Sequence, residues 1–138
     1  MTRAALCCRS PLDPCTYVAS ASSTSYAPRM RRFHIAIGVQ DIARSVEDYS
    51  ARLSCEPSVV VQNEYALWRT PTLNLSIRRT DGAPGALRHL GWEDPTASSF
   101  TTDTDVNGVV WEHFNAEQQD REIAETWPES AHQLSKRP

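Results

Sequence analysis

Residues 87–114, LRHLGWEDPTASSFTTDTDVNGVVWEHF, are the part of the chain that decides its fold. Their pattern predicts two short strands, at 87–93 and 109–114, joined by a polar segment rich in Ser, Thr and Asp. Because side chains alternate between the two faces of a strand, His89 can share a surface with Glu112. Histidine together with a carboxylate is common metal-ligand chemistry. The alternative interpretation is a hydrogen-bonded core histidine and a solvated glutamate.

The sequence before this stretch predicts a strand, a helix and three more strands. In FHIAIGV, residues 33–39, large apolar residues alternate with small or polar ones, which indicates a half-buried strand. Asp41 then caps a helix at 42–53, in which apolar residues recur at helical spacing. The three further strands are predicted at 58–62, 64–69 and 72–78.

The two ends of the chain differ from its middle. Residues 116–127, AEQQDREIAETW, predict a helix that ends before Pro128, and residues 129–138 are expected to fray. Residues 1–31 are rich in Ser, Ala, Arg and Pro and contain one acidic residue, a composition typical of disorder. We favour Met30 as the natural start of the protein over a transit peptide or a native leader.

The composition narrows the classes of function. With 138 residues the chain fits one domain with a sizeable core, and its formal net charge of -3 gives no reason to expect a nucleic-acid partner. No apolar run approaches the roughly 20 residues that a membrane span requires. Three of the four cysteines precede residue 31, so a disulfide framework is not expected and the predicted location is the reducing cytoplasm.

Four predicted strands place polar side chains on what we expect to be one concave surface. His34, Asn74, His89 and Glu112 occupy matching positions in the alternation, one on each strand. Two imidazoles and one carboxylate on rigid strands can hold Fe, Mn, Ni or Zn and leave coordination positions open. Arg78, at the rim, either holds an anionic group of a substrate or is a solvated residue at a strand end.

Four segments resemble the vicinal-oxygen-chelate superfamily, which includes glyoxalases, bleomycin-resistance proteins and extradiol dioxygenases. The segments are FHIAIGVQDIARSVEDYSARL (33–53), PTLNLSIRR (71–79), GALRHLGWE (85–93) and TDVNGVVWEHF (104–114). The resemblance covers about residues 32–114 and implies a divalent metal ion bound by His34, His89 and Glu112. It also implies that Asn74 stands where glyoxalase I has a fourth, acidic ligand. That departure argues against glyoxalase I and leaves the two-histidine, one-carboxylate set of the family's iron dioxygenases.

The same resemblance implies the fold. Members of the superfamily build it from two β-α-β-β-β modules, but residues 90–111 are too few for the rest of a complete second module. We therefore expect an α+β fold with one β-α-β-β-β module, a truncated second module of about two strands with a turn of helix near residues 97–100, and a C-terminal helix. The mixed sheet should curl into a half-open barrel. The domain is predicted at 32–115, with a leader at 1–31 and a helix and frayed tail at 116–138.

The function that the resemblance implies is that of a metal-dependent dioxygenase or lyase acting on a small organic molecule, with Asn74 and Arg78 contacting the substrate. The alternative is a non-catalytic, small-ligand-binding protein like the bleomycin-resistance members. In that case Trp68, Trp92 and Trp111 either line a groove or form the core. A third hypothesis is a module whose task is to pair with a partner. In all three cases we expect a homodimer, because a truncated module leaves strand edges uncovered.

Overall fold

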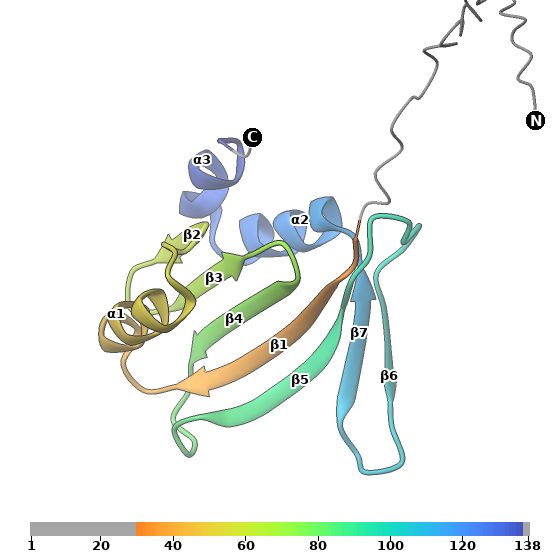
Figure 1. The fold of residues 1–138 in the computed structure, drawn as a ribbon, viewed down its shortest axis with the longest axis horizontal. Coiled ribbons are helices and arrows are strands. Elements are labelled where there is room, and N and C mark those ends of the chain that lie inside the picture. The colour runs from red at the N-terminus through yellow and green to blue at the C-terminus, as the bar shows by residue number, and fades with distance from the viewer. Residues whose placement is uncertain (1–29, 137–138) are drawn as a thin grey trace, which may run out of the picture.

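The fold is built on one mixed sheet of seven strands that curls without closing (Figure 1). The computed structural model describes residues 30–136. The strands are β1 Arg32–Val39, β2 Val59–Val61, β3 Tyr65–Arg69, β4 Leu73–Arg79, β5 Ala86–Glu93, β6 Thr101–Thr104 and β7 Val110–Phe114. The helices are α1 Ile42–Leu53, α2 Ala116–Thr126 and α3 Ala131–Leu134, with a 3-10 turn η1 at Pro128–Ser130. The strands lie in the order β2-β3-β4-β1-β5-β7-β6.

Strand β1 lies in the middle of the sheet and joins its two halves. It runs parallel to β4, with His34 opposite Asn74, and antiparallel to β5, with His34 opposite Gly91. Strand β7 runs parallel to β5 and places Glu112 beside Gly91. These four residues therefore form one row across four strands, and their side-chain positions face the same side of the sheet.

Helix α1 covers the face of the sheet opposite this row. Asp41 caps its first turn by accepting a hydrogen bond from the Arg44 N–H at 3.0 Å. The apolar stripe of the helix packs against Trp68 and Ile77, which are both fully buried. Burying an apolar side chain of this size contributes about 1.5–3 kcal/mol. This layer therefore holds β3 and β4 in place from behind the row of polar residues.

Helix α2 covers the other face, the one that carries His34 and Asn74. The Asn115 side chain caps the start of the helix and is part of a reciprocal capping box. Ile123 packs with Leu67 in a second apolar core between α2 and strands β2 and β3. Figure 1 shows α2 and α3 on the opposite side of the sheet from α1. The concave face of the sheet is thus partly closed by a helix from the end of the chain.

The predicted α+β fold with a curled, open sheet is confirmed, and every strand and helix for which bounds were predicted, except the turn of helix near residues 97–100, is found within one residue of those bounds. Strand β6 was not predicted. Its four residues, TTDT, are all exposed, so they lack the alternation that marks a half-buried strand. The turn of helix expected near residues 97–100 is wrong. The Ala97 N–H instead donates to the Asp94 carbonyl oxygen at 3.0 Å in a tight turn that leads toward β6.

The frayed tail expected at 129–138 is also wrong, as far as residue 136, where the described residues end. Turn η1 and helix α3 follow α2, and Leu134 packs on the second core. The Gln133 side chain accepts a hydrogen bond from the Val60 N–H and donates one to the Val60 carbonyl oxygen, both at 2.8 Å. These bonds satisfy backbone groups that the edge strand β2 would otherwise leave unpaired.

The predicted leader at 1–31 lies outside the described residues except for Met30 and Arg31. Arg31 is held in place rather than disordered, because it forms an ion pair with Asp94 at 3.2 Å and its guanidinium lies 4.5 Å from the centre of the Trp92 ring. Among residues 30–136, no helix combines the length and the apolar character needed to cross a membrane.

Candidate metal centre

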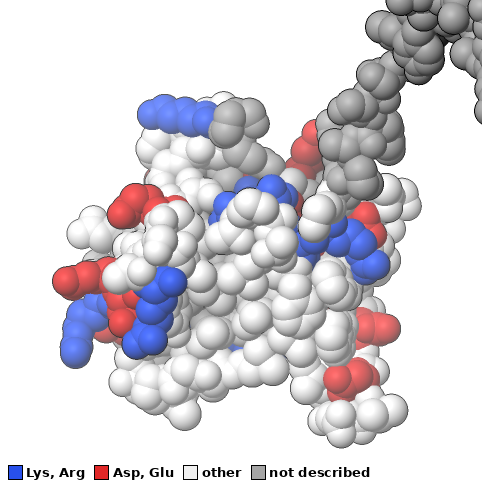
Figure 2. Space-filling view, viewed as in Figure 1, with Lys and Arg blue, Asp and Glu red and all other residues white. Residues whose placement is uncertain are grey.

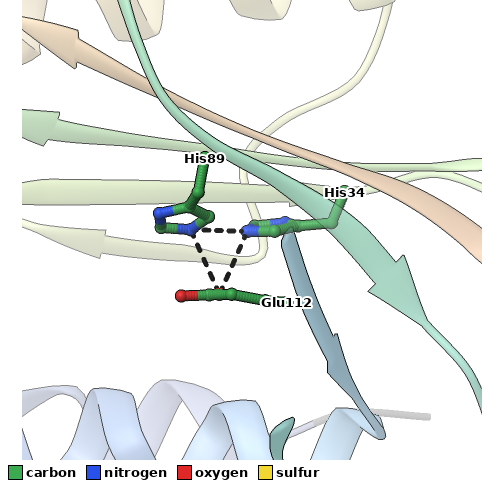
Figure 3. A group of neighbouring side chains, drawn as sticks. All are labelled: His34, His89 and Glu112. Atoms are coloured by element: carbon green, nitrogen blue, oxygen red, sulfur yellow. Dashed lines mark hydrogen bonds and ion pairs between the residues drawn. The ribbon is translucent and has the colours of Figure 1, made fainter. Parts of the chain in front are cut away.

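Three side chains from three strands converge on the concave face of the sheet: His34 from β1, His89 from β5 and Glu112 from β7 (Figure 3). The two histidine Nε2 atoms lie 3.1 Å apart. Glu112 Oε2 lies 3.1 Å from His89 Nε2 and 3.9 Å from His34 Nε2. The structure thus brings together all three of the residues that the sequence analysis named as metal ligands.

These separations suit donors that share one ion. Ligand atoms about 2.1 Å from an ion lie about 3 Å apart when they occupy adjacent coordination positions. Two imidazole nitrogens and one carboxylate oxygen are the donor set of several catalytic zinc sites and of non-haem Fe(II) sites, which keep further positions open. The group formed by His34, His89 and Glu112 can therefore hold a divalent metal ion.

The hydrogen-bond partners of His34 determine which of its ring nitrogens is free. Its Nδ1 lies 2.9 Å from Asn74 Oδ1 and 3.2 Å from the Asn74 carbonyl oxygen, and both oxygens can only accept. Nδ1 must therefore carry the hydrogen, which leaves the lone pair on Nε2, the atom that faces His89 and Glu112. Burial lowers the pKa of His34 to about 4, so the ring is neutral at pH 7. This is the protonation state that binds a metal.

Asn74 orients this histidine from below the cavity. Its side chain is fully buried, and its amide nitrogen donates to Glu93 Oε2 at 2.6 Å and to Gln119 Oε1 at 2.7 Å. Because an ionised carboxylate only accepts hydrogen bonds, Glu93 fixes the amide with its oxygen toward His34. The prediction that Asn74 contacts the substrate is not supported, since Asn74 does not line the cavity. Its geometry is that of a residue that holds a metal ligand in the correct orientation.

A cavity of about 150 Å³ opens beside the three donors, between the sheet and α2. It is lined by His34, Tyr65, Ser76, Arg78, Arg88, His89, Glu112, Gln119, Glu122, Ile123, Thr126 and Trp127. Arg78 thus lies where the sequence analysis placed it, at the border of the site. The volume is below the roughly 300–1,000 Å³ of sites for drug-sized ligands. The cavity therefore suits a small molecule.

The structure adds residues that the sequence analysis missed. Arg88 precedes His89, and simple alternation along a strand assigns the two residues to opposite faces. Glu122 and Trp127 lie in α2 and directly after it, and only tertiary packing brings them to this side of the sheet. Burial raises the pKa of Glu122, and the charge of Glu112 adds to that effect. No local sequence pattern marks any of these side chains as part of the site.

The tryptophans that the sequence offered as walls of a groove lie elsewhere. Trp68 is fully buried in the core beneath α1. Trp92 and Trp111 pack against Phe33 on the opposite face of the sheet, with ring centroids 5.1 and 6.1 Å from that of Phe33. The tryptophan that does line the cavity is Trp127, which no motif indicated.

Gly91→Ala is expected to weaken metal binding by about 10–100-fold. A Cβ atom at position 91 would lie 2.2 Å from the Glu112 carbonyl oxygen, so β5 and β7 must separate and carry Glu112 away from His34. A Zn²⁺ titration against a chromophoric chelator measures the affinity. Gly82→Ala is the matched control, because no atom lies within 4 Å of the Cβ it introduces. Equal affinities for the two variants would contradict the expectation.

Two comparisons of the sequence with known proteins found no match. No protein-family model matches the chain, and no curated protein matches its sequence. The chemistry open to the site follows from its three donor atoms, the cavity beside them and the charges around it.

Proposed function

We propose that this protein is a metal-dependent enzyme of the vicinal-oxygen-chelate superfamily, other than glyoxalase I, that acts on a small oxygen-bearing molecule as a dioxygenase or lyase. One observation carries the proposal: two imidazole nitrogens and a carboxylate oxygen lie within 4.8 Å of one another at the wall of a cavity. The choice of family rests on the resemblance of about residues 32–114 to that superfamily. The amide at position 74 favours a two-histidine, one-carboxylate site over a site with a fourth, acidic ligand.

The chain's own residues bind the ion and set its orientation. His34 is held in the binding tautomer by Asn74, and the partly exposed His89 and Glu112 complete the set from neighbouring strands. A hydrogen on His89 Nε2 lies within reach of both His34 Nε2 and Glu112 in this geometry, and binding of an ion through Nε2 requires that hydrogen to stand on Nδ1 instead. A divalent ion bound here supplies Lewis-acid activation of a substrate oxygen. The cavity gives the substrate access from one side.

A second candidate is a non-catalytic, small-ligand-binding homodimer of the same superfamily. Strand β6 leaves one edge of the sheet open, with all four of its residues exposed. The outer face of β1, β5 and β7 carries the partly exposed rings of Phe33, Trp92 and Trp111. Figure 2 shows a mostly uncharged surface over β1 and β5, beside the charged surface of α1. These features favour pairing of two copies under either candidate function.

A cytoplasmic location belongs to the same proposal. Within residues 30–136 the structure contains one cysteine, Cys55, and it is a free thiol. A thiol that forms no disulfide is in keeping with a reducing compartment.

The metal content of the full-length chain tests the proposed function. Protein purified without chelator and then offered Fe²⁺, Mn²⁺, Ni²⁺ or Zn²⁺ is expected to hold about one equivalent of metal by elemental analysis. The variant His34→Ala/His89→Ala/Glu112→Ala should hold almost none, because all three donors are gone.

A control variant, His113→Ala/His132→Ala/Glu117→Ala, removes two histidines and one glutamate that do not line the cavity, and it should keep the metal. Equal metal content in the parent and in the variant without the three donors would refute the proposed site. A parent that takes up no metal, yet sediments as a dimer, would favour the second candidate.

A further inference from the structure

Two arginines line the cavity beside the metal centre, and within residues 30–136 neither forms a direct ion pair with an acidic residue. Arg78 from β4 and Arg88 from β5 form no hydrogen bond or ion pair through their side chains within residues 30–136. The Arg78 guanidinium lies 5.2 Å from the centre of the Trp127 ring. Glu112 and Glu122 attract Arg88 electrostatically, but neither carboxylate lies within ion-pair distance of its guanidinium. Unpaired guanidinium groups at one cavity are suited to bind an anion.

A β-bulge brings Arg88 to this cavity. In the ladder between β1 and β5, Ala36 pairs with His89, and the next pair is Ile37 with Leu87. Arg88 is therefore an extra residue with no partner in the ladder. A bulge of this kind interrupts the alternation of side chains and re-aims one of them. This explains why two consecutive residues, Arg88 and His89, both line the cavity.

The charges around the cavity favour an anionic ligand once an ion is bound. The two arginines face two acidic residues of the lining, Glu112 and Glu122. Histidines that ligate an ion do so as neutral imidazoles, so His34 and His89 add no charge of their own. A divalent ion therefore adds positive charge that no residue of the lining neutralises. A carboxylate neutralises part of it, and its two oxygens match the planar fork of an arginine.

We propose that Arg78 and Arg88 bind the carboxylate of a small carboxylic acid whose second oxygen group lies at the metal centre. The contact between the ligand's second oxygen group and the metal ion rests on the proposed function. The contact between its carboxylate and the two arginines does not. A cavity of about 150 Å³ suits a small acid such as malonate.

Malonate is the probe that tests this assignment, and malonamide is its uncharged counterpart of similar shape. Calorimetric titration of the zinc-loaded, full-length protein is expected to show one malonate site, with malonamide binding about tenfold more weakly or worse. The Arg78→Gln/Arg88→Gln variant should lose about tenfold or more in malonate affinity while it retains its zinc by elemental analysis. The Arg44→Gln/Arg79→Gln variant removes two exposed arginines outside the cavity and should bind malonate like the parent.

Equal malonate affinity in the parent and the Arg78→Gln/Arg88→Gln variant, with zinc retained in both, would overturn the assignment. Inorganic phosphate that binds more tightly than malonate would overturn the choice of a carboxylate. A parent that takes up no zinc, but whose malonate binding still depends on Arg78 and Arg88, would remove the proposed metal function and support the anion site.

Discussion

Glu93→Ala is expected to lower the free energy of unfolding by about 3–5 kcal/mol, because it removes one partner from a buried set of ion pairs. Glu93 is 2% exposed. It accepts hydrogen bonds from Arg32 at 2.5 Å and from Arg69 at 3.1 Å. It also accepts one from the Asn74 amide at 2.6 Å. Urea denaturation followed by tryptophan fluorescence measures the change.

The loss of stability in Glu93→Ala comes from the buried polar groups that lose the carboxylate as a partner. The Arg69 side chain is 5% exposed, and without Glu93 it keeps the ion pair with Asp120 at 2.7 Å and a hydrogen bond to Gln119 Oε1 at 2.6 Å as compensation for its buried charge. The Asn74 amide also loses an acceptor, and leaving a buried donor unsatisfied costs about 1–3 kcal/mol. Through Asn74 the same carboxylate orients His34, so this network couples the stability of the fold to the geometry of the metal centre.

Two further variants separate the effect of the buried charge of Glu93 from the effect of removing any glutamate side chain. Glu64→Ala removes an exposed glutamate in the turn before β3 and should change the stability by about 0.5 kcal/mol or less. Glu93→Gln keeps the size of the side chain and removes its charge, so it should fall between Glu64→Ala and Glu93→Ala. An unfolding midpoint for Glu93→Ala equal to that of Glu64→Ala would contradict a stabilising role for the buried carboxylate.

Zinc at a thousand times its dissociation constant should raise the free energy of unfolding by about 4 kcal/mol. The ion stabilises the folded state because the donors His34, His89 and Glu112 are far apart in the chain and come together only when it folds. His89→Ala should abolish most of this gain. The His89 side chain is 16% exposed, so its truncation removes a ligand with limited loss of packing. Denaturation curves with and without zinc measure the difference.

His113→Ala is the matched control for this measurement. His113 follows Glu112 in β7, faces the other side of the sheet and pairs with Asp94 at 3.0 Å. His113 lies on β7, the strand that pairs with β5, which carries His89, and the loss of His113 leaves the three donors in place. The gain in stability from zinc should therefore persist. A gain of the same size in His89→Ala and His113→Ala would show that zinc stabilises the protein from another position.

The sequence alone determined most elements of the fold, though not β6, η1 or α3, and the three donors of the candidate site. Strand alternation and helix caps are local features, so the bounds of β1, α1 and β4 could be predicted from their own residues. The same alternation placed His34, His89 and Glu112 on one face, because a shift of one residue in any strand would have turned its side chain away. The resemblance to a known superfamily selected these residues from the other polar positions.

Only the tertiary structure decided what surrounds those donors. Asn74 bonds to Gln119, 45 residues away, and Gln133 bonds to Val60, 73 residues away. Contacts of this range leave no periodic signal in either segment, which is why the role of Asn74 and the ordered tail were not predicted. Arg88 reached the cavity through a bulge, which breaks the alternation on which the prediction relied. Local patterns specify which face a residue takes, but packing between distant segments determines which residues meet there.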